Sequence, residues 1–388
     1  MRILFFSPWP PQRTGIADYA YGLVKGLVQN GYDVTVITEA DVPKLLAGVE
    51  IHPPIWLEHC DILEYDRIVY QVGNNSHFHL FMMPYLFRFR GVIHLHDLVL
   101  HHLMAYVLYA NGNPQLYLEL LNKWYGPHVV SLMEDMHEQS EPIWESEKVT
   151  ELPLFEEVLQ YAEFSIIHSR FAQQKILATF PNLACHVIPQ VYEDMHISTH
   201  DREKTLSIGI FGGVDSNKRT EIVLHALSQC MPLQARVELN IVGSLHDDCI
   251  YLKDLVQELG LGDVVTFHGR VSDEKFIQLL HATDLCISLR YPTMGETSAI
   301  VMRALQSAIP VVVSDVGWYK ELPGFVQKIK PVTSSEIDEL TRIIRDFAVS
   351  STYSKKLKTE AIKYAEADLN FDLIIKKYSA ILSETQLC

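Results

Sequence analysis

Apolar residues in this chain form short continuous runs, separated by longer stretches in which they recur every three or four positions. The first run covers residues 3–7 and ends at a proline-rich turn, and residues 16–29 have the period of an amphipathic helix. Asn30-Gly31 predicts the end of this helix, and residues 34–37 belong to the next strand. The pattern predicts a βαβ unit whose first loop lies at the carboxyl end of its strand.

Further strands of the first half are predicted at residues 67–71, 92–96 and 164–168. Residues 101–159, between the last two of these strands, are predicted to be mostly helical, with breaks at residues 111–114 and Pro142.

A second series of strands and helices follows the polar stretch 198–204, which we interpret as a linker. Its strands are predicted at residues 206–211, 237–242, 264–268, 285–289 and 311–314. Its helices are predicted at residues 221–228, 273–282, 297–307, 351–367 and 371–383. Strands that alternate with helices are typical of doubly wound α/β domains, in which ligands bind beyond the carboxyl ends of the strands.

The length and composition fit two such domains. A single hydrophobic core stops growing at roughly 250–300 residues, and this chain has 388. Apolar residues make up 48% and charged residues 21%, which is ordinary for globular proteins.

The net charge of −16 disfavours a polyanionic partner, and no run of Lys and Arg resembles a nucleic-acid binding surface. Arg88 and Arg90 follow the apolar segment 81–87. This segment is either a point of contact with an anionic membrane or a core helix with a solvated end.

The six cysteines are scattered without a CxxC pair, and we interpret them as reduced thiols. The apolar run at the N-terminus is too short for a signal peptide, and no stretch has the length of a membrane span. We therefore expect a cytoplasmic protein, with peripheral attachment at the inner face of the membrane left open.

Two glycine-containing loops follow predicted strands and lead into helices. The first, PPQRTG at residues 10–15, ends at Gly15, where the backbone could approach a phosphate; a plain tight turn is the alternative. The second contains Gly212, Gly213, Lys218 and Arg219, which together could hold a diphosphate, unless the two basic residues are simply solvated. Neither loop has the GxGxxG spacing of a dinucleotide site.

A third loop, RYPTMGETS at residues 290–298, precedes a predicted helix. Glu296 could accept hydroxyl groups of a sugar, while Thr297 and Ser298 meet a phosphate. The alternative is that Glu296 is only a favourable acidic residue in the first turn of the helix.

Polar residues also follow two strands of the first half. His94 and His96 point to the same side of their strand, but no further residue completes a metal set at a recognisable spacing, so we expect no metal. His96 could bind hydroxyl groups of a sugar or an acceptor, steered by Asp97, or it could be a structural histidine. Asn74 and Asn75 carry amides suited to carbohydrate, although such turns are common for backbone reasons alone.

In their order along nearly the whole chain, these segments resemble the GT4 family of retaining glycosyltransferases. The opening PPxxxGIADY resembles the N-terminal glycine loop of that family, and His96 lies where members carry an active-site histidine. Gly212 and Lys218 match both ends of its phosphate loop. FHGRVSD at residues 267–273 and ATD at residues 282–284 resemble the segments that precede its donor-binding glutamates.

Two departures from the family pattern stand out. Gly213 replaces the arginine of the phosphate loop, so Arg219 would have to supply the second cation. The two donor-binding glutamates align with Gly295 and Arg303, which leaves Glu296 one position out of register. An arginine cannot accept ribose hydroxyls but can bind phosphate or pair with an acid. The GETS, GNN and HDL segments are typical of one bacterial subgroup.

The resemblance implies a GT-B fold: two Rossmann-like domains that face each other across a cleft, with a C-terminal helix crossing back to the N-terminal domain. Residues 1–197 would bind the acceptor, residues 205–368 the nucleotide-sugar donor, and residues 369–388 would form the returning helix. The reaction would be transfer of a sugar with retention of configuration. His96, Lys218 and Glu296 would be the catalytic residues, and no cofactor or divalent metal would be required.

Under the same resemblance, Gly15, Gly212, Gly213, Arg219 and Arg303 would contact the donor, together with Thr297 and Ser298, and Asn74, Asn75 and Asp97 would contact a glycan or lipid-linked acceptor. Two alternatives stay open. A nucleotide-sugar epimerase can share this architecture, and the replacements Gly213 and Arg303 would suit a catalytically silent homologue that acts as a binding or scaffold subunit. The sequence identifies neither the sugar, the nucleotide base, the acceptor nor the oligomeric state.

Overall fold

A computed structural model describes residues 1–138, 143–198, 205–230 and 237–384. The chain divides into two compact units. The N-terminal unit contains Met1–Glu193, Met294–Thr297 and Phe371–Cys388, and the C-terminal unit contains Asp194–Thr293 and Ser298–Asn370. The expected linker lies outside the described residues from position 199 to 204.

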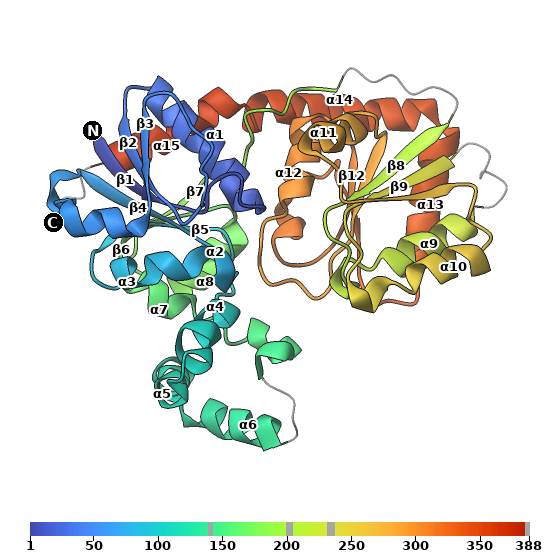
Figure 1. The fold of residues 1–388 in the computed structure, drawn as a ribbon. Coiled ribbons are helices and arrows are strands. Elements are labelled where there is room, and N and C mark those ends of the chain that lie inside the picture. Colours follow the sequence, from blue (N-terminus) through green and yellow to red (C-terminus); the bar gives the residue numbers. More distant parts are fainter. Residues whose placement is uncertain (139–142, 199–204, 231–236, 385–388) are drawn as a thin grey trace. The chain divides into compact units, whose positions relative to one another are not determined.

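The N-terminal unit is built on a seven-stranded parallel sheet with the order β3-β2-β1-β4-β5-β6-β7 (Figure 1). The strands are β1 (Arg2–Phe6), β2 (Asp33–Ile37), β3 (Val49–His52), β4 (Arg67–Val72), β5 (Gly91–Leu95), β6 (Ala162–Ile167) and β7 (Cys185–Val187). All five residues of β5 are buried, because helices cover both faces of a parallel sheet. The strand order reverses between β1 and β4, and crevices for ligands form at such switch points.

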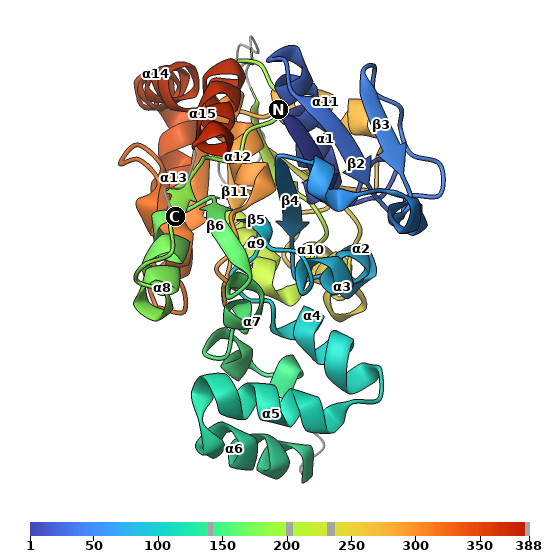
Figure 2. The same cartoon turned by 90° about the vertical axis from the view of Figure 1, so that its left-hand side faces the viewer.

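Helices of the N-terminal unit come from both ends of the chain (Figure 2). They are α1 (Gly15–Gln29), α2 (Ser76–His79), α3 (Met83–Leu86), α4 (His101–Ala105), α5 (Pro114–Tyr125), α6 (Pro127–Glu138), α7 (Phe155–Leu159), α8 (Arg170–Thr179) and α15 (Phe371–Ser383). A Cβ atom at Gly26 of α1 would lie 2.8 Å from Cγ1 of Ile375, so the two helices pack closely at this glycine. The C-terminal helix thus returns to the N-terminal unit, as the sequence analysis expects.

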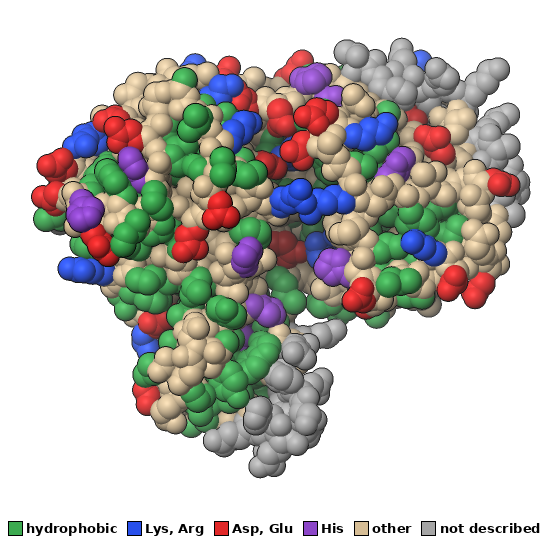
Figure 3. All heavy atoms as spheres, in the orientation of Figure 1, with side chains coloured by type: hydrophobic (Ala, Val, Ile, Leu, Met, Phe, Trp, Pro, Cys, Tyr) green, Lys and Arg blue, Asp and Glu red, His purple; other side chains and the backbone are tan. Residues whose placement is uncertain are grey.

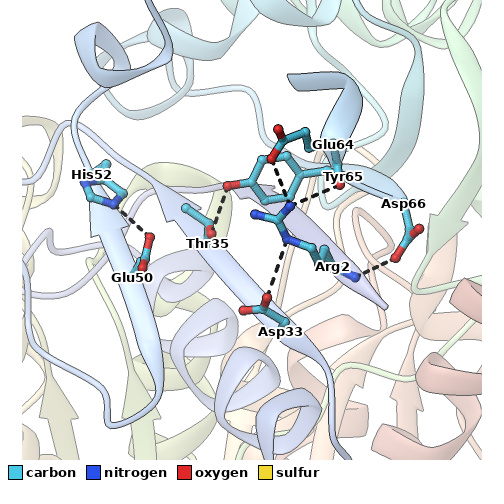
Figure 4. Close-up of polar contacts among 8 residues, drawn as sticks. All are labelled: Arg2, Asp33, Thr35, Glu50, His52, Glu64, Tyr65 and Asp66. Atoms are coloured by element: carbon cyan, nitrogen blue, oxygen red, sulfur yellow. Dashed lines mark hydrogen bonds and ion pairs between the residues drawn. The ribbon is translucent and has the colours of Figure 1, made fainter. Parts of the chain in front are cut away.

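A network of charged and polar side chains holds the amino end of β1 (Figure 4). Nη1 of Arg2 lies 3.1 Å from Oε2 of Glu64, and Nε of Arg2 lies 3.6 Å from Oδ2 of Asp33. The backbone amide of Arg2 donates to Asp66 over 2.7 Å. These side chains are largely exposed, so we regard the network as a local support of the amino end of β1 that contributes little to global stability.

The C-terminal unit contains a six-stranded parallel sheet with the order β10-β9-β8-β11-β12-β13. The strands are β8 (Leu206–Phe211), β9 (Val237–Val242), β10 (Val265–Gly269), β11 (Leu285–Ser288), β12 (Val311–Ser314) and β13 (Gln327–Ile329). The helices are α9 (Thr220–Ser228), α10 (Leu252–Glu258), α11 (Asp273–His281), α12 (Ala299–Gln306), α13 (Glu336–Val349) and α14 (Ser351–Asp368). This is the strand order of a Rossmann fold, with its switch point between β8 and β11.

The predicted fold class, α/β with two Rossmann-like domains, is therefore confirmed. The predicted strands recur with small shifts, whereas the short strands β3, β7 and β13 were not predicted. Figure 3 shows acidic and basic side chains interspersed on the surface, and hydrophobic side chains on the segment that holds α4 to α6. Within the described ranges, no helix has the length and apolar character that crossing a bilayer requires. The five described cysteines form no disulfide bond.

Candidate functional site

The loop after β8 crosses the loop after β9 at two glycines. Gly212 has a φ of 89° and Gly243 a φ of 147°, both in the region that favours glycine. A Cβ atom at Gly243 would lie 2.1 Å from the carbonyl oxygen of Gly212, so no other residue fits there without movement of the backbone. The two glycines therefore let the loops after β8 and β9 pack backbone against backbone beside the switch point of the sheet.

Lys218 lies in this loop, within the short 3-10 turn Ser216–Lys218. Its ammonium group donates a hydrogen bond of 3.1 Å to the carbonyl oxygen of Phe211, at the end of β8. The side chain also lines a small cavity with Ser288 and apolar residues of β8, α9 and β11. Burial, and secondly the nearby charge of Arg290, lower the pKa of Lys218 to about 8. A bound anion would favour the charged form of this lysine.

Arg290 follows β11, the strand next to β8 in the sheet. Its backbone amide donates to Oγ of Ser314 over 2.9 Å, and its Nη1 atom lies 3.8 Å from Oδ1 of Asp215. Asp215 directly precedes the turn that holds Lys218, so this ion pair places Arg290 beside the loop of Lys218. The charge of Arg290 is a secondary cause of the lowered pKa of Lys218, after burial, and the charge of Asp215 opposes it. Arg290 is the first residue of the RYPTMGETS loop, and no role for it was predicted from the sequence. Its position two residues after a strand that borders the switch point is the signal that identifies it.

Arg219 has a different environment. Its Nε and Nη2 atoms donate to the two carboxylate oxygens of Glu336 over 3.1 and 2.6 Å. Glu336 is 2% exposed and also accepts a hydrogen bond from the amide of Val332. This bidentate pair engages the guanidinium of Arg219 with α13, so the geometry favours Arg290 over Arg219 as the second cation beside Lys218.

The predicted donor residues at α12 also have local partners. The hydroxyl oxygen of Ser298 accepts a hydrogen bond of 3.5 Å from the amide of Val301 and caps the helix, and Thr297 directly precedes it. Arg303 is largely buried, and its Nη1 atom lies 3.6 Å from Oδ2 of Asp194. At the position of the second family glutamate, this chain therefore has an arginine paired with an acid.

Glu296 belongs to the short segment Met294–Thr297 of the N-terminal unit. Its Oε2 atom accepts a hydrogen bond of 2.7 Å from the amide of Met294, whose carbonyl oxygen accepts one of 3.3 Å from Val99. Gly295 has a φ of 76°, and a Cβ atom there would lie 2.9 Å from Cβ of Leu98. Because residue 295 is a glycine, the segment Met294–Thr297 can lie close to Leu98, which follows His96 and Asp97 in the chain.

The loops after β1, β4 and β5 meet at Gly73 of the N-terminal unit. A Cβ atom at Gly73 would lie 2.6 Å from Cδ1 of Ile16, 2.8 Å from Nε2 of His79 and 3.1 Å from Oδ2 of Asp97. The helix α1 begins beside Ile16, at Gly15. Gly15 and Asp97 are therefore brought to one end of the sheet, as predicted.

The two predicted asparagines have structural partners. Oδ2 of Asp97 accepts a hydrogen bond of 2.8 Å from the amide of Asn74. The side chain of Asn74 accepts from the amide of Leu103 over 3.1 Å and lies 2.8 Å from Nδ1 of His102. Asn75 caps α2 through a 3.0 Å hydrogen bond from His77. These contacts fix the loop around Asp97, whose side chain is half-buried.

His96 belongs to a buried cluster with His94 and His168. Its Nε2 atom lies 2.7 Å from Oε1 of Gln71, and its Nδ1 atom lies 3.1 Å from Nε2 of His168. Burial is the main cause that lowers the pKa of all three histidines. Both ring nitrogens of His96 already have partners, so a sugar hydroxyl would have to displace one of them.

The cluster also bears on the question of a metal. His94, His96 and His168 could offer one nitrogen each within 4.8 Å. However, the rings of His94 and His96 are stacked, with an angle of 15° between planes and 4.6 Å between centroids. An imidazole binds a metal along a lone pair in its own plane, and two stacked planes do not converge on one ion. This arrangement does not favour a shared metal.

Sequence comparisons relate the chain to sugar-transferring proteins. Residues 193–365 match a family model described as Glycosyl transferases group 1. An uncharacterized glycosyltransferase of Methanocaldococcus jannaschii is 24% identical over 342 residues, which cover 81% of this chain and 80% of that protein. The MMP alpha-(1->4)-mannosyltransferase of Mycolicibacterium hassiacum is 31% identical over 125 residues, or 31% of this chain and 29% of the relative.

Two solved structures have a similar fold over nearly the whole length of this chain. HepE of Anabaena, in complex with UDP and glucose, has a TM-score of 0.65 and 18% identity, with 99% of both chains covered. Sucrose-phosphate synthase of Thermosynechococcus elongatus has a TM-score of 0.67 and 16% identity, with 98% of both chains covered. At these identities the likeness establishes the GT-B fold. Together with the family match, it supports a glycosyltransferase of this fold.

Proposed function

We propose that this protein transfers a sugar from a nucleotide-sugar donor to a glycan or lipid-linked acceptor, with retention of anomeric configuration. The observation that carries this proposal is the position of two cations, Lys218 and Arg290, in the loops that follow the paired strands β8 and β11, where Arg290 pairs with Asp215 of the Lys218 loop. A diphosphate is the chemical group that this pair suits best, because two positive charges and a glycine-rich backbone can neutralise it without a divalent ion.

The reaction breaks the bond between the anomeric carbon and the diphosphate, and its electron pair leaves with the phosphate oxygen. The acceptor hydroxyl oxygen forms the new bond to the same carbon, and its proton passes to the departing phosphate. Lys218 and Arg290 stabilise the negative charge that develops during this step. They contribute to the rate because this charge is greater in the transition state than in the bound donor.

Gly15, Gly212 and Gly213 permit close approach of backbone to the donor in this proposal, and Thr297 and Ser298 meet its phosphates. Glu296 accepts sugar hydroxyls. Arg303, held by Asp194, replaces the ribose-binding acid of the family pattern. We leave Arg219 out of the donor site because its guanidinium is bound to Glu336.

Asp97 is the residue of the N-terminal unit that we assign to acceptor binding, supported by Asn74 and Asn75. A carboxylate of this kind accepts hydrogen bonds from hydroxyl groups of a carbohydrate. We assign His96 a positioning role behind Asp97. Peripheral contact with the cytoplasmic face of a membrane belongs to the same proposal and would bring the protein to a lipid-linked acceptor.

The donor experiment starts with UDP-sugars, since the structure of HepE was solved with UDP and with UDP-glucose. Release of nucleoside diphosphate is measured for a panel of nucleotide sugars, with and without an acceptor mixture, in the presence of magnesium or of a chelator. Release that depends on acceptor and persists with chelator supports the proposal. Conversion of the donor sugar without any acceptor would identify an epimerase, and binding without turnover would identify a silent homologue.

A further inference from the structure

The loops after β8 and β9 run side by side beyond the sheet and continue its parallel pairing. The amide of Val214 donates to the carbonyl oxygen of Ser244 over 2.8 Å, and the amide of His246 donates to the carbonyl oxygen of Val214 over 2.9 Å. Further along, the amide of Ser216 donates to Oδ2 of Asp248 over 3.3 Å. These bonds hold the backbone of His246 beside the loop that follows β8.

The two sides of the loop after β8 differ. Val214 is fully buried in the core of the C-terminal unit. Because successive side chains of an extended segment point to opposite faces, positions 213 and 215 face away from that core. The backbone of Asp215 is extended, with a φ of −113° and a ψ of 169°, and its Oδ1 atom lies 3.8 Å from Nη1 of Arg290. Gly213 thus faces the side of the loop on which Asp215 meets Arg290.

The ring of His246 lies on this side of the loop. A Cβ atom at Gly213 would lie 3.3 Å from Nε2 of His246. At the preceding position, a Cβ atom at Gly212 would lie 2.7 Å from Nζ of Lys218. Two consecutive glycines therefore leave room for two nitrogen atoms that can donate hydrogen bonds, one from the same loop and one from the loop after β9.

The imidazole of His246 is available to a ligand. The residue is exposed, and none of the described residues forms a hydrogen bond with either of its ring nitrogens. The guanidinium of Arg219, by contrast, is bound to Glu336. An imidazole with a proton on Nε2 donates a hydrogen bond, and such bonds are strong where the acceptor is an anionic phosphate oxygen.

A departure in the sequence accounts for the space that the ring fills. Gly213 stands where the family pattern has an arginine. The φ of Gly213 lies outside the left-handed region, so its backbone would accept an L-residue, and the ring of His246 lies in the way of a larger side chain. The ring of His246 and a side chain at position 213 are thus alternatives for one space.

We propose that His246 is a donor-binding residue whose Nε2–H group donates to a phosphate oxygen of the nucleotide sugar, in the space that an arginine at position 213 would fill. This inference rests on the proposed function, because it places the diphosphate at the loops of Lys218 and Arg290. It adds a contact from the loop after β9, so that three neighbouring loops, those after β8, β9 and β11, hold the same group.

The first test compares two histidines of the C-terminal unit. Calorimetric titrations with UDP, GDP and ADP, in the presence of a chelator, identify the nucleotide that binds the wild type. We expect H246A to weaken its binding about tenfold, and H246Q to retain most of it because an amide also donates. The matched control H225A, in the last turn of α9, should bind as the wild type does. Normal binding by folded H246A would overturn the proposal.

Inorganic pyrophosphate separates a contact with phosphate from a contact with the base or the sugar. It is titrated as a competitor of the bound nucleotide in the wild type and in H246A. We expect H246A to weaken the binding of pyrophosphate and of nucleotide by a similar factor, because the lost hydrogen bond goes to a phosphate oxygen. A loss of nucleotide affinity with unchanged pyrophosphate affinity would place His246 at another part of the donor and refute the assignment.

A double-variant cycle tests the shared space. G213R should weaken nucleotide binding, because its Cβ atom meets Nε2 of His246. In G213R/H246A the ring is gone and the arginine can enter its space, so the loss should be smaller than the product of the two single losses. Losses that simply multiply would count against the proposal. If G213R does not fold, equal losses in H246A and H246Q would do the same.

The outcomes also separate this inference from the proposed function. Weakened binding by K218A together with normal binding by H246A would remove the role of His246 and leave the donor site at Lys218 in place. Absence of nucleotide binding by the wild type would overturn both.

Discussion

Arg219 and Glu336 form a bidentate ion pair across 117 positions of sequence, with both side chains largely buried. The pair joins the loop after β8 to the first residue of α13. Arg219 is therefore next to Lys218 in the sequence, but its side chain links the loop to α13. In the proposed donor site, the second cation beside Lys218 is instead Arg290, which follows the neighbouring strand β11.

Removal of this ion pair should affect stability. R219A leaves the buried carboxylate of Glu336 without its partner, and we expect the free energy of unfolding to fall by about 3 kcal/mol. The double variant R219A/E336A should recover part of this loss, because no uncompensated charge remains. Denaturant unfolding of the three proteins gives the comparison. An unchanged unfolding midpoint for R219A would show that the pair contributes nothing to the fold.

Lys218 should make nucleotide binding depend on pH. Its pKa of about 8 lies below the ordinary value, so the ammonium form is lost as the pH rises through this region. The affinity for a nucleoside diphosphate should therefore fall between about pH 7 and 9, while an arginine at this position keeps its charge. Calorimetric titrations of wild type and K218R at both pH values test this. Parallel pH profiles for the two proteins would argue against titration of Lys218.

Arg303 should depend on the charge of Asp194. R303E places two carboxylates where an ion pair lies at 3.6 Å, and we expect a lower melting temperature and weaker donor binding. Reversal of both charges in R303E/D194R should restore at least part of the stability. Improved donor binding by R303E alone would show instead that this chain only lacks the acid of the family pattern.

Two glycines of α1 should respond oppositely to alanine. A Cβ atom at Gly26 would lie 2.8 Å from Cγ1 of Ile375, whereas at Gly22 the nearest atom would be 3.6 Å away. G22A should raise the free energy of unfolding by up to about 1 kcal/mol through helix propensity, and G26A should lower it by about 1–3 kcal/mol through overpacking. Thermal unfolding measures both. Equal effects of the two changes would contradict the close packing of α15 on α1.

Local patterns in the sequence predicted most of the fold, because long apolar strands and amphipathic helices have strong periodicity. The strands β3, β7 and β13 have only three or four residues each, and Ile329 is the one buried residue among them, so no such pattern marks them. Lys218 was found because its spacing from Gly212 lies within one loop. Arg290 was given no role because its proximity to Lys218 arises from the pairing of β8 with β11.

Contacts between distant segments also changed the interpretation of the histidines. His94 lies in β5 and His96 directly follows this strand, but His168 follows the neighbouring strand β6, and only the sheet brings the three rings together. Tyr378 reaches the same cluster from the end of the chain. Similarly, the segment Met294–Thr297 joins the N-terminal unit through Leu98 and Val99, which its sequence does not indicate.

We propose above that Lys218 and Arg290 bind the diphosphate of a nucleotide-sugar donor. Calorimetric titration of wild type, K218A, R290A and R219A with UDP and other nucleoside diphosphates, in the presence of a chelator, tests it most directly. We expect one nucleotide to bind the wild type without metal, K218A and R290A each to weaken binding at least tenfold, and folded R219A to bind normally. Absence of binding by any nucleotide, or equal binding by K218A, R290A and the wild type, would contradict it.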